Sequence, residues 1–319
     1  MTNIEWTDET WNPVRGCTRV SPGCQNCYAE RQAIRHAGAG GSYEGLAQIT
    51  NGHPQWTGKL REVQSALEMP FHWKKPRRVF VNSMSDLFHP DISREFLVGI
   101  FGVMAETPQH TYQILTKRPE HMVQVMPFVW DILGNAGRPL ENVWLGVSVE
   151  NQHYADARTL LLQATPAAVR FLSIEPQLDK VTLEKFLTCT CGRGVYTAPE
   201  RHMRLCGFRD RIHWVICGGE SGPGARPFNL AWAESLLKEC RAAAVPFFLK
   251  QVGAVPMWER EYWNSRPSIR LLNANNAKRV PDGFVPLLMN DRKGGNLEEW
   301  PSELQVREFP SQKAEALSA

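Results

Sequence analysis

Short, mostly apolar runs alternate along the chain with longer stretches in which apolar residues recur at helical spacing. The runs cover residues 78–83, 111–117, 143–149, 170–175, 213–217 and 246–251, and each has the length of a strand that is buried on both faces. The helical patterns lie between them, at residues 93–106, 119–133, 154–163, 179–187 and 229–244. Repeated alternation of this kind predicts an α/β fold in which parallel strands are joined by crossover helices.

Polar residues at the ends of almost all these strands favour a barrel over a doubly wound sheet. Barrels assemble their active sites from the C-terminal ends of many strands, whereas a doubly wound sheet uses one switch point. The plainer alternative is that strand ends face water and are polar for that reason. We predict a partial (β/α) TIM-like barrel over residues 1–253, with a Cys/Arg-rich insertion at 188–212 and an irregular extension at 254–319.

Composition and charge narrow the class of protein only slightly. Hydrophobic residues make up 43% and charged residues 22% of the chain, which is typical of a folded globular protein. The net charge of +3 is compatible with a polyanionic partner but too small to indicate one. The sequence has neither a membrane-length apolar run nor the apolar core of a secretory signal, so we expect a cytoplasmic protein without membrane association.

Three cysteines near the N-terminus are the most informative feature. Cys17, Cys24 and Cys27 have the spacing C-x6-C-x2-C. Three thiolates on one loop can bind three irons of a cubane cluster and leave the fourth iron open to a small molecule. The alternative is a zinc knuckle with a fourth ligand such as His36, but zinc sites usually pair cysteines in two C-x2-C units, and no second unit exists. The spacing therefore favours an iron–sulfur cluster.

A second cysteine group lies in the expected insertion. Cys189, Cys191, His202 and Cys206 give the pattern C-x-C-x10-H-x3-C, a plausible tetrahedral zinc set. A short segment with few apolar residues needs a metal ion to fold around, which favours zinc over a second iron–sulfur cluster or unligated thiols. Arginines in the same segment are suited to contact nucleic-acid phosphates, although such arginines are more often only solvated.

Several segments carry a resemblance to known families: IEWTDETWNPVRGC, SPGCQNCYAE, VFVNSMSDLFH, ILTKRPE, WLGVSVEN, FLSIEP and WVICGGESG. Over about residues 3–253 the chain resembles the phage-related and bacterial three-Cys-motif family of unknown function. The early cysteines of a βα-repeat chain also resemble the cluster motif of radical S-adenosylmethionine (SAM) enzymes, whose usual spacing is C-x3-C-x2-C. More distantly, the strands ending Ser-x-Ser-Asp and Thr-Lys are similar to those of spore photoproduct lyase.

The resemblance implies a barrel of the radical SAM type and a radical SAM enzyme. Cys17, Cys24 and Cys27 would bind a [4Fe–4S] cluster, and SAM would bind the open iron. Reduction of the sulfonium would release methionine and a 5′-deoxyadenosyl radical that abstracts hydrogen from a substrate, expected to be a nucleotide or nucleic-acid base. An electron donor and a three-Cys-motif partner protein are the implied partners.

The resemblance also implies which strand ends bind SAM. Ser83 or Ser85, with Asp86, would contact its amino group, Lys117 its carboxylate, and Ser148 would lie near the ribose. These roles suit the chemistry, because a carboxylate requires a cation and an ammonium requires oxygen acceptors. A solvated strand end is the alternative for Lys117.

A glycine-rich loop follows the strand at residues 213–217. Gly218, Gly219 and Glu220, together with Glu175, are candidates for a wall of the SAM or substrate pocket, because glycines let the backbone approach a ligand. The alternative is a loop that only turns a corner, with the glutamates in structural pairs with lysines.

Cys217 is the candidate hydrogen-donor thiol. Spore photoproduct lyase has such a cysteine at a strand end, whereas residues 82–86 of this chain contain none. A lone cysteine in a strand is more often simply buried. The competing hypothesis for the whole chain is a zinc-stabilised nucleic-acid-binding or adaptor protein without catalysis, and metal analysis would distinguish the two.

Overall fold

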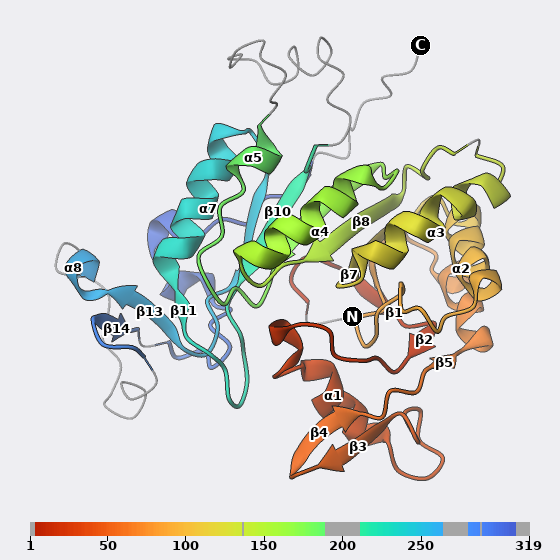
Figure 1. Cartoon of the computed structure of the whole chain (residues 1–319), viewed down its shortest axis with the longest axis horizontal. Helices are drawn as coiled ribbons and strands as arrows, with labels where there is room; N and C mark the ends of the chain where they lie inside the picture. Colours follow the sequence, from red (N-terminus) through yellow and green to blue (C-terminus); the bar gives the residue numbers. More distant parts are fainter. Residues whose placement is uncertain (1–3, 136, 189–210, 264–279, 288, 311–319) are drawn as a thin grey trace. The chain divides into compact units, whose positions relative to one another are not determined.

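The computed structural model of the chain describes residues 4–135, 137–188, 211–263, 280–287 and 289–310 (Figure 1). The chain forms two compact units, residues 1–173 and residues 174–319. Each unit contains its own strands, helices and buried apolar side chains.

Parallel strands joined by helices form the centre of the first unit. The elements are β1 Glu9–Trp11, β6 Arg78–Val81, α2 Arg94–Glu106, β7 Thr111–Thr116, α3 Pro119–Ile132, β8 Val143–Ser148, α4 Gln152–Ala164 and β9 Val169–Ile174. The strands lie in the order β1-β6-β7-β8-β9, and each pair of neighbours is parallel. Helices α2, α3 and α4 are the crossovers between successive strands from β6 to β9 (Figure 1).

The local sequence explains where these helices begin. The Ser93 hydroxyl caps α2 by accepting a hydrogen bond from the Phe96 N–H at 3.3 Å. Asn151 caps α4 in the same way, accepting from the Tyr154 N–H at 3.2 Å. Pro119 occupies the first turn of α3, where a missing N–H leaves no partner unsatisfied.

Large aromatic side chains fill the core of the first unit. Phe101 of α2 packs edge-on against Trp130 of α3, with ring centroids 5.3 Å apart. Phe171 of β9 is fully buried, and a Cβ at Gly146 of β8 would lie 2.5 Å from its ring. Glycine at position 146 therefore makes room for an aromatic ring on the neighbouring strand.

A small layer built around α1 lies between β1 and β6 in the sequence. Its elements are β2 Val14–Arg15, η1 Pro22–Cys24, α1 Tyr28–Ala33, η2 Ile34–His36, β3 Ala47–Thr50, β4 His53–Trp56, β5 Arg61–Glu62 and η3 Gln64–His72. Strands β3 and β4 form an antiparallel hairpin in which Ala47 pairs with Trp56 (Figure 1). Ala33, Tyr43, Leu46 and Ala47 form the buried centre of this layer, and Trp56 packs against them.

The second unit contains a further strand–helix–strand repeat. Its elements are α5 Glu184–Leu187, β10 Trp214–Gly218, β11 Phe228–Asn229, α7 Leu230–Ala242, β12 Phe247–Gln251, β13 Pro256–Glu259, α8 Arg260–Trp263, β14 Phe284–Pro286, η4 Leu297–Glu299 and η5 Ser302–Leu304. Strands β10 and β12 are parallel neighbours, and α7 packs against both. Strand β13 pairs in parallel with β11 and antiparallel with β14.

The α/β class predicted from the sequence is confirmed. All six predicted strands are present, and their ends differ from the predicted ends by at most two residues. In the first unit, consecutive strands from β6 to β9 are neighbours, without the reversal of order that defines a doubly wound sheet. This sequential order is consistent with a partial TIM-like barrel. Within the described ranges, no helix combines the length and the apolar content needed to cross a bilayer.

Three details differ from the sequence-based predictions. The helix expected at 179–187 is limited to the single turn of α5, Glu184–Leu187. The hairpin β3–β4 was not predicted, because its strands are short and partly exposed and show no apolar run. The stretch from residue 254 is not wholly irregular, since β13 buries Met257 and Trp258 and pairs with two strands. Most of the predicted insertion at 188–212 lies outside the described residues.

Candidate functional site

The cysteine loop, residues 17–27, is preceded by Gly16, where the backbone conformation requires a glycine. Gly16 has φ of 91°, and a Cβ at this position would collide with the carbonyl oxygen of Lys59. Cys24 ends η1, and Cys27 immediately precedes α1. All three cysteines of the loop are partly buried free thiols.

The surroundings of the loop disfavour free thiolates. Burial raises the pKa of Cys17 to about 12; Asp86 and Cys27 add to this rise, and the Arg118 guanidinium opposes it. Burial also raises the pKa of Cys27, and Cys24 adds to that rise. Because burial and a neighbouring cysteine raise the pKa values of Cys17 and Cys27, a bound cation would favour the deprotonation of these two thiols. Among the described residues, no three Cys, His, Asp or Glu side chains are already positioned as a metal-ligand set.

Arg118 attaches the cysteine loop to the ends of two strands. Its Nη1 donates to Asp86 Oδ2 at 3.0 Å and lies 3.8 Å from Cys17 Sγ. Its Nη2 donates to the carbonyl and hydroxyl oxygens of Thr18, at 2.8 and 2.6 Å. Arg118 follows β7, Asp86 follows β6, and both side chains are buried. The ion pair offsets part of the desolvation cost of both charges.

Glu150, just beyond β8, makes a second attachment. Its Oε1 accepts from Ser21 Oγ at 2.6 Å, and its Oε2 accepts from Arg158 Nη1 at 3.1 Å. A Cβ on Gly23 would lie 2.5 Å from Glu150 Oε1, so the loop backbone lies directly against this carboxylate. Lys117 Nζ is 3.7 Å from the same oxygen. The fully buried Glu150 is therefore paired with two cations.

Three of the predicted SAM-binding residues lie together beside this loop. Lys117 Nζ donates to Ser148 Oγ at 2.7 Å, and the Lys117 N–H donates to Asp86 Oδ2 at 3.0 Å. Ser148 is buried, whereas the Lys117 side chain keeps 22% of its surface exposed. Of the three, Lys117 is therefore the group that a bound anion can reach most easily.

The two other predicted serines already have intramolecular partners. Ser83 Oγ donates to Asn12 Oδ1 at 3.2 Å, and Ser85 Oγ donates to the Val14 carbonyl at 2.8 Å. The Tyr28 hydroxyl donates to the Ser83 carbonyl, which connects α1 to the segment after β6. Both serines join that segment to the chain that follows β1, and each hydroxyl oxygen can still accept a hydrogen bond from a ligand.

Glutamates of the second unit form ion pairs with nearby cations. Lys250 Nζ donates to Glu175 Oε1 at 2.7 Å. Arg226 Nε and Nη2 donate to the two oxygens of Glu220, at 2.9 and 2.7 Å. The pairing with a lysine considered as an alternative is thus present for Glu175, whereas the partner of Glu220 is an arginine.

The glycines and the cysteine at the end of β10 are tightly packed. A Cβ at Gly219 would lie 2.6 Å from the Val252 carbonyl oxygen, and one at Gly218 would lie 3.2 Å from another backbone oxygen. Cys217 is fully buried, its Sγ donates to Gln177 Oε1 at 3.2 Å, and burial raises its pKa well above the ordinary value. These observations favour the buried-core interpretation of Cys217 over the hydrogen-donor role.

The second predicted metal site, formed by Cys189, Cys191, His202 and Cys206, lies outside the described residues. Its zinc remains a prediction.

The structure also identifies a charged pair that the sequence analysis did not single out. Glu30, in the first turn of α1, is buried and accepts from Arg19 Nε and Nη2 at 2.9 and 2.5 Å. It also accepts from the Trp56 N–H at 3.2 Å, which joins β4 to the cysteine loop. The position of Glu30 three residues after Cys27 was an available signal, whereas nothing in the sequence pointed to Trp56.

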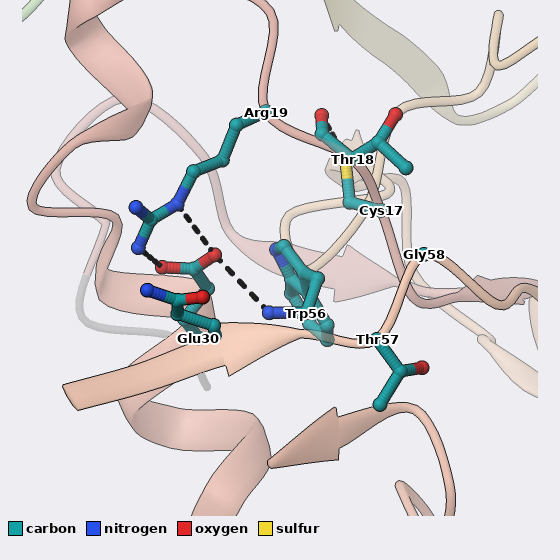
Figure 2. Close-up of a pocket in the computed structure, with 8 residues that line it drawn as sticks. Cys17, Thr18, Arg19, Glu30, Trp56, Thr57 and Gly58 are labelled. Carbon is teal, nitrogen blue, oxygen red and sulfur yellow. Dashed lines mark hydrogen bonds and ion pairs between the residues drawn. The ribbon is translucent and has the colours of Figure 1, made fainter. Parts of the chain in front are cut away.

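A pocket of about 280 Å³ opens beside the first cysteine of the loop (Figure 2). It lies entirely within the first unit, between the cysteine loop and the end of the β3–β4 hairpin. Its lining residues are Cys17, Thr18, Arg19, Glu30, Gln55, Trp56, Thr57 and Gly58.

Comparison with known proteins gives a family without an assigned activity. A family model described as "Protein of unknown function (DUF5131)" matches residues 1–284. Comparison with curated proteins and with solved structures finds no match. The family match contains no link to radical SAM enzymes or to spore photoproduct lyase, so that part of the resemblance remains a prediction. Because the match covers most of its length, this chain belongs to the DUF5131 family of proteins of unknown function.

Proposed function

We propose that this protein is a radical SAM enzyme whose cysteine loop binds a [4Fe–4S] cluster. The observation that carries the proposal is the attachment of this loop to the carboxyl ends of three successive parallel strands, β6, β7 and β8. Arg118 and Asp86 make one attachment, and Glu150 makes the other. In barrel enzymes this end of the strands is where substrates and cofactors bind.

The donor set suits such a cluster. Three free thiols on one loop match the three cysteines that bind a cubane cluster while one iron stays open. Burial raises the pKa values of Cys17 and Cys27, and a neighbouring cysteine adds to each rise, so iron binding would favour their deprotonation. Arg118 Nη1, 3.8 Å from Cys17 Sγ, is placed to donate to that sulfur once it is a thiolate.

Lys117 is the residue best placed to bind the SAM carboxylate. Its ammonium already contacts Ser148 Oγ and lies near Glu150, at the end of two neighbouring strands. Asp86 accepts from Arg118 and from two backbone N–H groups, which leaves it less free to bind the SAM amino group. The chemistry that the bound cluster and SAM supply is one-electron cleavage of a sulfonium followed by hydrogen abstraction, with the electron coming from an external low-potential donor.

The proposed substrate is a nucleotide or a nucleic-acid base. This part of the proposal comes from the distant resemblance to spore photoproduct lyase. A three-Cys-motif protein is the proposed partner, and zinc at the second cysteine group is the proposed structural metal.

Anaerobic reconstitution with iron and sulfide tests the proposal. We expect a brown protein that absorbs near ~400 nm, contains about four irons and four sulfides per chain, and releases 5′-deoxyadenosine from SAM under reduction. Cys24→Ser should remove the cluster and the turnover. Cys240→Ser is the matched control, because Cys240 is buried in α7, far from the loop in sequence.

Two results would contradict the proposal. One is a protein that takes up zinc but no iron at the cysteine loop. The other is a cluster that survives in Cys24→Ser, which would place it elsewhere in the chain. Zinc at the loop, together with salt-dependent binding of nucleic acid and no SAM cleavage, would instead favour the nucleic-acid-binding hypothesis.

A further inference from the structure

We propose that the pocket between Cys17 and the β3–β4 hairpin, here named the Trp56 pocket, binds a nucleobase stacked on the Trp56 indole. Figure 2 shows Trp56 at the centre of this pocket, with Cys17 on one side and the Arg19–Glu30 pair on another. The proposal deepens the proposed function, since it assigns a ligand class to a surface that shares Cys17 with the cysteine loop.

The aromatic wall of the pocket is held in place before any ligand binds. The Trp56 N–H donates to Glu30 Oε1 at 3.2 Å, and the same carboxylate accepts from Arg19. The Trp56 ring packs against the Tyr43 ring, with centroids 6.2 Å apart. The Arg15 guanidinium lies over the Tyr43 ring, 5.8 Å from its centroid. A wall fixed in this way loses little conformational entropy when a flat ring stacks on it.

The polar groups of the pocket have donors and acceptors to spare. Within the described residues, the Gln55 side-chain amide and the Trp56 indole N–H make no hydrogen bond. Arg19 uses Nε and Nη2 for Glu30, and its Nη1 has no partner in the same part of the chain. The pocket thus offers an amide with both a donor and an acceptor, together with a cationic donor.

This combination fits a nucleobase better than other flat ligands. Any type of nucleobase can stack on an indole ring, and a side-chain amide matches the alternating donors and acceptors of a base edge. Arg19 Nη1 is suited to a phosphate or sugar oxygen attached to the base. The volume of about 280 Å³ is near the lower end for small-molecule sites, enough for one base with part of its sugar.

Two molecules could supply the base: SAM itself or the nucleotide substrate. Binding assays with full-length protein, both reconstituted and metal-free, distinguish them. The probes are S-adenosylhomocysteine and the four 5′-ribonucleotide monophosphates, titrated by calorimetry into wild type, Trp56→Ala, Trp56→Phe and Gln55→Ala. The matched control is Trp232→Ala, which removes a half-buried tryptophan from α7 of the second unit.

We expect Trp56→Ala to raise the Kd of at least one probe by about 5- to 150-fold, the range for loss of one base–aromatic stack. Trp56→Phe should retain most of the affinity, and Gln55→Ala should reduce the discrimination between bases. An effect confined to S-adenosylhomocysteine and adenosine monophosphate would assign the pocket to the cofactor, and an effect on a monophosphate of another base would assign it to the substrate.

The proposal is wrong if every Kd is unchanged in Trp56→Ala, or if no probe binds at millimolar concentration. Should Trp56→Ala fail to fold, unchanged affinities and unchanged base discrimination in Gln55→Ala would overturn it equally. The outcome is separable from the proposed function. If the cluster forms but Trp56→Ala changes no Kd, only this inference is rejected. If probe binding depends on Trp56 but no cluster forms on reconstitution, only the radical SAM proposal is rejected.

Discussion

Replacement of Arg118 by methionine tests whether the buried ion pair with Asp86 anchors the cysteine loop. The substitution keeps much of the side-chain volume and removes the charge and all the donors. It eliminates the 3.0 Å ion pair with Asp86 and two hydrogen bonds to Thr18. Asp86, itself buried, would lose its only ion-pair partner in the described part of the chain.

The expected magnitude follows from what Asp86 retains. Breaking a buried ion pair by removal of one partner costs about 3–5 kcal/mol. Asp86 would still accept from Thr116 Oγ1 at 2.7 Å and from the N–H groups of Phe88 and Lys117, both at 3.0 Å. We therefore expect a loss near the lower end, about 3 kcal/mol, for Arg118→Met. The double variant Asp86→Asn/Arg118→Met also removes the uncompensated charge. Its loss of unfolding free energy should be smaller than that of Arg118→Met by at least about 1 kcal/mol.

Hydrogen–deuterium exchange in increasing urea, read on peptides from β6 and β7, measures the unfolding free energy of the first unit. Arg78→Met is the matched control, because its pair with Asp8 is exposed and should contribute no more than about 1 kcal/mol. The reasoning is refuted if Arg118→Met loses no more stability than Arg78→Met. It is also refuted if the double variant is less stable than Arg118→Met alone.

Three further outcomes are expected. Gly16→Ala should cost about 1–3 kcal/mol in urea unfolding, since φ is 91° and its Cβ meets the Lys59 carbonyl; an unchanged midpoint would contradict this. Burial lowers the pKa of His89, and the Arg118 charge lowers it further. The unfolded chain therefore binds the His89 proton more tightly than the folded chain, so stability should fall as the pH drops below about 6.5. His89→Asn should reduce this dependence of stability on pH. A pH profile identical to that of wild type would contradict the role of His89. In metal-free protein at pH 8, iodoacetamide should label Cys17 about 10- to 100-fold more slowly than a free thiol, because burial raises its pKa to about 12; mass spectrometry of labelled peptides checks the rate.

The strands and most of their connecting helices could be predicted because their patterns are local. Each strand of the α/β repeat is a continuous apolar run, and the caps at Ser93 and Asn151 lie at the helix starts. The gathering of Asp86, Lys117 and Ser148 was also predictable, because carboxyl ends of neighbouring parallel strands meet at one edge.

The partners of those strand-end groups could not be predicted, because they depend on side-chain direction. Lys117 and Arg118 are successive cations in the sequence, yet Lys117 bonds Ser148 whereas Arg118 turns to Asp86 and Thr18. Trp56 was missed for a different reason. It lies in a four-residue strand with a partly exposed surface, which has no apolar periodicity to detect.

The acidic residues that follow strands also have partners that the sequence does not reveal. Glu150 and Glu220 both follow a strand, but Glu220 pairs with Arg226 six residues later, whereas Glu150 contacts Ser21 of the loop. Around the loop, each buried carboxylate is paired with at least one cation, and the cations of these pairs exceed the carboxylates by one. The cations are Arg19, Lys117, Arg118 and Arg158, and the carboxylates are Glu30, Asp86 and Glu150.

The excess of one positive charge bears on the state of the three thiols. With three protonated thiols the excess charge is left to solvent, which reaches Arg19 and Lys117, whose side chains are 38% and 22% exposed. Three thiolates on a doubly charged metal centre carry one net negative charge, which balances the excess. The proposed metal-bound loop would balance this excess, and in that state Arg118 Nη1, 3.8 Å from Cys17 Sγ, would donate to a thiolate.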